Sequence, residues 1–175
     1  QYEVSLAVAT RTMQITFILP PLSMAGGIKV VAIYARLLSA RGHTVHIVSP
    51  PAKPVSLREK FRALRRGEGW PKYERQAKSH LDGSGLKHQV LDTWRPVVDS
   101  DVPDADVVIA TWWETAEWVH ALSPGKGAKV HFVQGHETFP FLPKARVQAA
   151  YRLPLHKVTI SHWLVELLRD EYGAS

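Results

Sequence analysis

Two short segments of this sequence combine residue types that could bind and transform a polar ligand. Gly26 and Gly27 stand directly before an apolar stretch, while His136 and Glu137 follow shortly after another. Glycines at the start of a helix let the backbone approach a ligand closely, and a helix N-terminus offers free N–H donors to a phosphate. An imidazole beside a carboxylate could orient a hydroxyl, act as a base or stabilise positive charge. The pattern therefore indicates a phosphate-binding turn and a polar pair that could take part in catalysis.

These residues also have structural interpretations, which the sequence alone leaves open. The two glycines could simply form the turn between a strand and a helix, and His136 and Glu137 could lie in a solvated loop. Trp112 and Trp113 could stack on the apolar face of a sugar, or they could pack inside the protein.

Other ligand classes are disfavoured by motifs that the sequence lacks. Adjacent glycines do not make the G-x-G-x-x-G fingerprint, and the expected strand 44–49 ends in Ser49-Pro50 without the acid that holds a ribose. The Walker pattern GxxxxGK[ST] is missing too. The nine histidines show no H-x-x-x-H or H-E-x-x-H spacing, and the sequence has no cysteine. We therefore expect neither a metal nor any other cofactor.

Basic residues concentrate in one segment, residues 53–78. It holds nine basic and three acidic residues, which accounts for the whole net charge of +6. Part of the segment predicts an amphipathic helix whose apolar residues share one face and whose arginines flank or oppose it. The candidate membrane-contact residues are Leu57, Arg58, Phe61, Arg62, Arg65 and Arg66, with Leu64 completing the apolar face. Contact with an anionic membrane, contact with RNA and a solvated loop are the three interpretations; nucleic acid is not the expected partner, because the rest of the chain is neutral.

Alternating strands and helices are predicted to position these residues. Hydrophobic patterning predicts strands over 13–19, 44–49, 88–91, 106–111, 129–133 and 157–160, and helices over 28–40, 56–66, 114–122, 146–151 and 162–172. This alternation indicates an α/β protein with a Rossmann-like, doubly wound parallel sheet. Such sheets bind ligands beyond the carboxyl ends of their strands, so the site is expected among residues 19–27, 49–50, 111–114, 134–138 and 161.

Three segments together resemble glycosyltransferase family 4, the retaining glycosyltransferases of the GT-B fold. Residues 13–51 resemble the family's first strand, glycine pair, apolar helix and RGH-x-V entry to the second strand. The stretch HFVQGHETFPF resembles the FVQ-x-x-E segment of rhamnosyltransferase-like members. VTISHWLVELLRDEYG resembles the serine and amphipathic helix that close the N-terminal domain.

The resemblance implies that residues 13–175 form the N-terminal, acceptor-side domain, that residues 1–12 are an extension, and that the donor-binding C-terminal domain is absent from the chain. It implies transfer of a hexose, with retention, from a nucleotide-sugar to a glycan or a lipid-linked acceptor. The full-length protein would be the enzyme, and this chain alone would be inactive. The alternatives are a non-catalytic Rossmann-type ligand-binding domain and an RNA-binding protein that uses residues 53–78.

The resemblance also implies roles for single residues. Gly26 and Gly27 match the loop that approaches the donor phosphates, and His136 and Glu137 lie where the family places polar residues beside the reacting sugar. Ser161 matches a serine that ends the last strand; with Trp112 and Trp113, it is a candidate contact for acceptor or sugar. Because no secretory leader or membrane span is evident in the sequence, we expect a cytoplasmic protein, peripheral at the inner face of the plasma membrane if the basic helix binds lipid.

Overall fold

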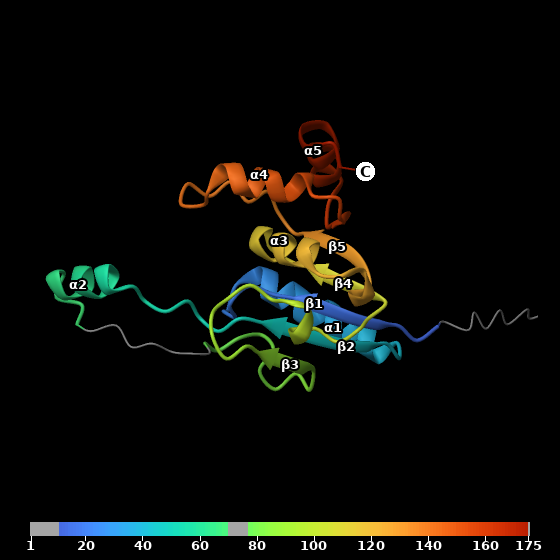
Figure 1. The fold of residues 1–175 in the computed structure, drawn as a ribbon, viewed down its shortest axis with the longest axis horizontal. Coiled ribbons are helices and arrows are strands. Elements are labelled where there is room, and N and C mark those ends of the chain that lie inside the picture. The colour runs from blue at the N-terminus through green and yellow to red at the C-terminus, as the bar shows by residue number, and fades with distance from the viewer. Residues whose placement is uncertain (1–10, 70–76, 175) are drawn as a thin grey trace, which may run out of the picture.

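The computed structural model describes residues 11–69 and 77–174, which form one parallel sheet with helices on both faces (Figure 1). The strands are β1 (Gln14–Ile18), β2 (Thr44–Ser49), β3 (Lys87–Val90), β4 (Val107–Ala110), β5 (Ala128–Val133) and β6 (His156–Thr159). The helices are α1 (Gly26–Ala40), α2 (Leu57–Arg65), α3 (Trp113–Ala121), α4 (Lys144–Arg152) and α5 (His162–Tyr172), with short 3-10 helices η1 (Asp99–Asp101) and η2 (Pro124–Lys126).

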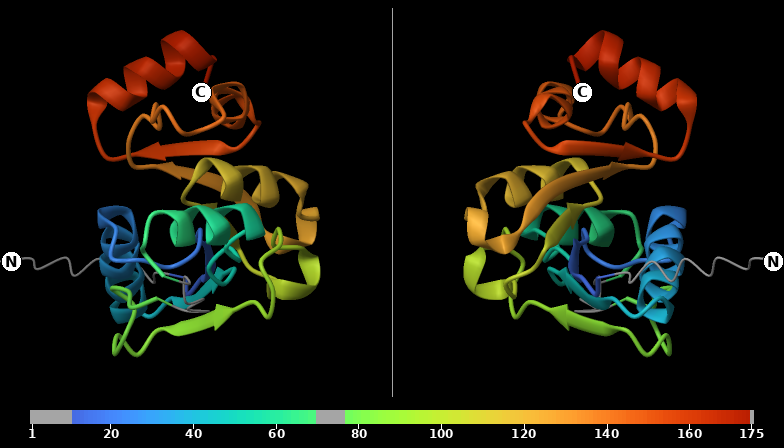
Figure 2. Two further views of the ribbon diagram at one scale, coloured as in Figure 1. Left: turned by 90° about the vertical axis from the view of Figure 1, so that its left-hand side faces the viewer. Right: turned by 90° about the vertical axis from the view of Figure 1, so that its right-hand side faces the viewer.

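The six strands are all parallel and lie in the order β3-β2-β1-β4-β5-β6. In Figure 2, β3 and β6 accordingly lie at opposite ends of the sheet. This is the strand order of a doubly wound Rossmann-type sheet, in which the chain builds outward from β1 in one direction and then in the other. The predicted fold class is therefore confirmed.

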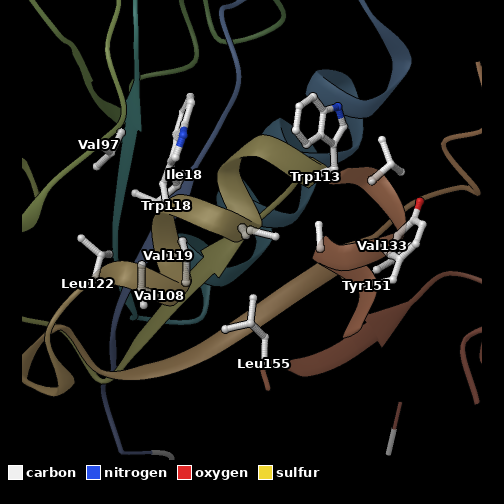
Figure 3. Packing of buried hydrophobic residues seen from close by; sticks show 14 of the residues in the cluster. Ile18, Val97, Val108, Trp113, Trp118, Val119, Leu122, Val133, Tyr151 and Leu155 are labelled. Carbon is white, nitrogen blue, oxygen red and sulfur yellow. The ribbon is translucent and has the colours of Figure 1, made fainter. Parts of the chain in front are cut away.

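The core has two halves because side chains alternate between the faces of each strand. On one face α1 buries Ile28, Val31 and Ala35 against a set that includes Phe17 of β1. On the other face α3, α4 and α5 pack over a set that includes Ile18, the next residue along β1. Figure 3 shows this second half, in which Trp113, Trp118 and Tyr151 supply the large rings and the aliphatic side chains fill the space between them.

Some element boundaries differ from those predicted. Helix α1 begins at Gly26, two residues earlier than expected, so both glycines belong to its first turn. Helix α4 is longer at both ends than the predicted 146–151. The two 3-10 helices carry too few residues for a periodic signal and were not predicted.

Two predicted segments extend beyond the described residues. Residues 1–10 of the expected extension lie outside them, while Arg11 pairs with Asp106 at 2.9 Å beside the start of β4. The basic segment 53–78 likewise includes residues 70–76, which lie outside the described part. Within residues 11–69 and 77–174, no helix has the length and apolarity needed to cross a membrane.

Candidate functional site

A pocket of about 560 Å³ opens where the strand order reverses, beyond the carboxyl ends of β1 and β4. At such a reversal, neighbouring crossover connections leave in opposite directions and expose a crevice. The pocket is lined by the loops after β1, β4 and β5 and by the start of α1. Its lining residues are Pro20, Pro21, Ser23, Ala25, Gly27, Ile28, Thr111, Trp112, Glu114, Gln134, Gly135, His136, Glu137 and Phe139.

One wall is the N-terminus of α1, which no side chain caps. Ala25 occupies the cap position, and the first turn holds no acidic residue. Among the described residues, the backbone N–H groups of Gly26 and Gly27 have no recorded acceptor. Unsatisfied N–H groups and the positive end of the helix dipole favour an anion at this position. A Cβ added to Gly27 would lie 3.6 Å from the Gln134 side chain, an ordinary contact, so this side chain covers one side of the helix turn.

Another wall carries Glu137, whose side chain is only 8% exposed. Its Oε2 accepts a hydrogen bond from the backbone N–H of Trp113 at 3.2 Å, and no partner for Oε1 is found among the described residues. Burial raises the pKa of the Glu137 carboxyl to about 8, against the lowering effect of the Trp113 hydrogen bond. The solvated-loop interpretation of Glu137 is therefore wrong. Near neutral pH this group is largely protonated, with one oxygen left for a ligand.

Two tyrosines from the C-terminal helices hold the loop that carries His136 and Glu137. The Tyr151 hydroxyl accepts a hydrogen bond from the Glu137 backbone N–H at 2.9 Å and donates one to the Gly135 carbonyl at 3.4 Å. The Tyr172 hydroxyl lies 2.9 Å from Nε2 of His136. Because both tyrosine rings are packed in the core, they fix the direction in which the polar pair points.

A second cavity, of about 350 Å³, adjoins the same polar pair. His136, Glu137 and Phe139 line both this cavity and the larger pocket. Its remaining walls come from the loop after β5, from α4 and from the end of α5. Glu137 therefore stands at the boundary between two spaces, where a group could contact two ligands at once.

The other predicted site residues are placed differently. Gly26 does not line the pocket, although its N–H belongs to the same helix turn as that of Gly27. Trp112 is half-buried on the pocket wall, whereas Trp113 is 3% exposed in the core and has no face free for a sugar. The prediction of a sugar contact at Trp113 is therefore corrected to packing.

Ser161 does not line the pocket either. It occupies the N-cap position of α5, beyond the edge strand β6, and its Oγ has no hydrogen-bond partner among the described residues. The pocket lies at the carboxyl ends of β1, β4 and β5, and none of its lining residues comes from the segment after β6. The expectation of a ligand contact at Ser161 gains no support from this position.

Three residues that build the site were not named as candidates, although Gln134 lies within the expected range 134–138. Gln134, whose side chain lies over Gly27, stands at the carboxyl end of β5, but polar residues end many strands. Tyr151 and Tyr172 read as ordinary core residues of α4 and α5, and only the fold brings their hydroxyls to the loop. As for metal, residues 11–69 and 77–174 contain no group of three His, Asp or Glu side chains close enough to hold one ion.

The fold and pocket define a Rossmann-like α/β domain with an open pocket at its topological switch point. No protein-family model matches the chain, and no curated protein matches it. Among solved structures, a glycosyltransferase from Rickettsia africae ESF-5 is similar, with a TM-score of 0.44 and 14% sequence identity. That similarity covers 94% of this chain but only 41% of the other. A likeness of this degree carries no information about the site.

Proposed function

We propose that this chain is the N-terminal domain of a retaining GT-B glycosyltransferase, and that donor phosphates and acceptor meet in the pocket at the β1/β4 reversal. The observation that carries the proposal is the pair of features on the walls of that pocket. One is the uncapped N-terminus of α1, and the other is the buried carboxyl of Glu137. The first suits a diphosphate, and the second suits a reacting sugar or an acceptor hydroxyl.

In this proposal, different residues stabilise the negative and the positive charge that develop as the sugar–phosphate bond breaks. The diphosphate leaving group gains negative charge, which the N–H groups of Gly26 and Gly27 stabilise without reorganisation. The anomeric carbon gains positive charge, which the ionised form of Glu137 stabilises through its free oxygen. His136, held by Tyr172, positions the acceptor hydroxyl, and the exposed side of Trp112 offers a ring for a sugar face. These N–H donors act together with basic groups of the second domain on the diphosphate charge, and the proposal includes no metal.

The finer parts of the proposal rest on the sequence resemblance. They are membership of family 4, transfer of a hexose to a glycan or lipid-linked acceptor, and a second domain that holds most of the nucleotide. Both resembling segments contribute to the pocket. The glycine pair of residues 13–51 begins α1, which forms one pocket wall. The glutamate of the segment HFVQGHETFPF is Glu137, which lines the same pocket.

The test is glycosyl transfer by the full-length protein that carries this domain. A panel of nucleotide-sugars would be screened, and proton NMR of the first product formed would give its anomeric configuration, expected to be that of the donor. Glu137→Gln should lower turnover by about 100-fold, with the donor dissociation constant little changed. Wild-type turnover should rise with pH through about 8, because ionisation of Glu137 creates the active form. The variant should lack this rise.

Glu166→Gln is the matched control, because Glu166 is an exposed α5 residue that lines neither cavity. It should leave turnover and its pH profile unchanged. An inverted product would overturn the retaining mechanism. Ligand binding in the pocket without transfer from any nucleotide-sugar would favour a non-catalytic Rossmann-type binding domain instead.

A further inference from the structure

Helix α2 is held by its own local contacts and stands away from the rest of the molecule. The chain leaves the carboxyl end of β2 and runs outward to this helix (Figure 1). A capping box starts it: Ser56 Oγ accepts from the Glu59 N–H at 3.2 Å, and the Glu59 carboxylate accepts from the Ser56 N–H at 2.9 Å. None of its residues is buried. The apolar face of α2 therefore does not pack on the part of the domain that the structure describes.

The apolar residues of α2 form one stripe that faces solvent. Leu57, Phe61 and Leu64 are 68%, 61% and 44% exposed. At 100° per residue they fall within about 60° of the helix circumference. Three large apolar side chains in line on an uncovered helix are costly in water, and such stripes mark contact with an apolar phase or partner.

The charges of α2 indicate which kind of partner its apolar stripe contacts. Residues 57–66 hold five basic side chains and one acidic one, which gives a net charge of +4. The basic residues are Arg58, Lys60, Arg62, Arg65 and Arg66. Lys60 borders the apolar stripe on one side, and Arg65 and Arg58 border it on the other. A polyanion such as RNA would use the charges but leave the stripe in water. An anionic bilayer surface satisfies both, because the stripe sinks below the head groups while the bordering cations meet them.

We propose that α2 docks this protein on an anionic membrane surface, with Leu57, Phe61 and Leu64 inserted and the bordering arginines on lipid phosphates. The helix lies in the plane of the interface and does not span the bilayer. Because it stands beyond the carboxyl edge of the sheet, where the pocket also opens, docking keeps the pocket near the membrane. The proposal rests on α2 alone and holds whether or not the pocket transfers a sugar.

The test is co-sedimentation of the chain with vesicles of phosphatidylcholine alone or with 30% phosphatidylglycerol. We expect binding only to the anionic vesicles, weakening as salt rises. Arg58→Gln/Arg62→Gln/Arg65→Gln should lower the partition coefficient about 100-fold, since each charge at an anionic surface contributes about fivefold. Phe61→Ser should also abolish most binding. Because Phe61 is exposed, its replacement should leave the melting temperature unchanged, which separates docking from folding.

The matched control changes the same number of charges elsewhere. Arg36, Arg41 and Lys87 are exposed residues outside α2, and their joint replacement by Gln should reduce binding far less. Equal sedimentation with neutral and anionic vesicles, or none with either, would overturn the proposal. So would retention on polyuridylate that is unaffected by Phe61→Ser, which would assign α2 to nucleic acid. Self-association that is lost in Phe61→Ser, without vesicle binding, would assign the stripe to a second copy of the chain.

Discussion

At the scale of single residues, the site depends on one carboxyl group placed where carboxyl groups are rarely stable as anions. Among the described residues, the Glu137 carboxyl accepts one hydrogen bond, from the Trp113 N–H, and it has little contact with water. One neutral donor does not replace the lost hydration of a carboxylate, so burial dominates and the pKa rises to about 8. The group thus changes charge near neutral pH, which is where a catalytic acid or base is most useful.

The shifted pKa of Glu137 makes a prediction about stability. Its folded pKa of about 8 lies above the ordinary value of 4.5, so the native state binds the proton more tightly than the unfolded state. The stability from this group is full below about pH 4.5 and is lost as pH rises through about 8. Between pH 5 and pH 8 the free energy of unfolding should fall by on the order of 3 kcal/mol on this account. Urea titrations at several pH values measure it.

Glu137→Gln isolates that contribution from those of other groups. The Gln amide oxygen can still accept from the Trp113 N–H, and the amide has no charge to bury. The variant should therefore be more stable than wild type at pH 8 and similar to it at pH 5. Buried His131, whose pKa burial lowers to about 3, destabilises both proteins equally as pH falls below its ordinary 6.5. If the free energy of unfolding changed with pH in the same way for wild type and variant, the argument from burial of Glu137 would be contradicted.

Gly27 gives a second prediction at this scale. Gly27→Ala should raise the free energy of unfolding by about 0.5 kcal/mol, because alanine is the better helix former and its Cβ meets only ordinary contacts. Gly27→Val should leave the fold intact. If the proposed function holds, it should lower the turnover of the full-length protein by about tenfold or more, because a branched side chain narrows the pocket. Gly125→Val, in η2 and away from both cavities, is the control for activity. Wild-type turnover in Gly27→Val would remove this helix turn from the site.

At the scale of elements, β4 is positioned by a glycine that carries no motif in the sequence. Gly127, just before β5, has φ of +100°, and a Cβ there would lie 2.6 Å from the Ala105 carbonyl oxygen. The close approach lets the Ala128 N–H donate to the Asp106 carbonyl at 2.9 Å and so starts the pairing of β4 with β5. These two strands carry the Trp112 and Glu137 loops, so the pocket depends on this approach.

Gly127→Ala should therefore destabilise the protein by about 2–4 kcal/mol, from backbone strain and the clash together. Chemical denaturation measures the change. Gly125→Ala, two residues earlier, is the matched control, because its Cβ would meet only Ser123 Oγ at 3.9 Å; it should shift stability by less than about 0.5 kcal/mol. Equal effects of the two substitutions would show that the approach at Gly127 is not tight in solution.

At the scale of the whole molecule, both core halves share one sheet, so neither can open without exposing the other. We predict that the chain unfolds in urea in one cooperative transition, with coincident loss of helical circular dichroism and tryptophan fluorescence. A broad transition that differs between the two probes would contradict the shared core.

We also predict weak binding of nucleoside diphosphates by the chain alone, since the proposed function assigns the base and ribose contacts to a second domain. Micromolar affinity by calorimetry would show that this division of roles is wrong.

The sequence by itself determined the elements and the edge of the sheet where polar residues gather. Hydrophobic periods of two and of about 3.6 are local properties, so strand 44–49 and helix 162–172 could be predicted to the residue. The capping box and stripe of α2 are equally local. Because parallel strands end at one edge, the sequence pattern alone places the loops holding Gly27, Trp112 and Glu137 near one another.

Only the tertiary structure decided which of those loops meet and which side chains they bury. The strand order places the reversal between β1 and β4, which admits Gly27, Trp112 and Glu137 to one pocket and leaves Ser161 outside it. Local periodicity does not encode this order, because it depends on contacts between segments far apart in the chain. The same holds for the burial that shifts the pKa of Glu137 and for the exposure of α2, since each depends on what the rest of the chain places nearby.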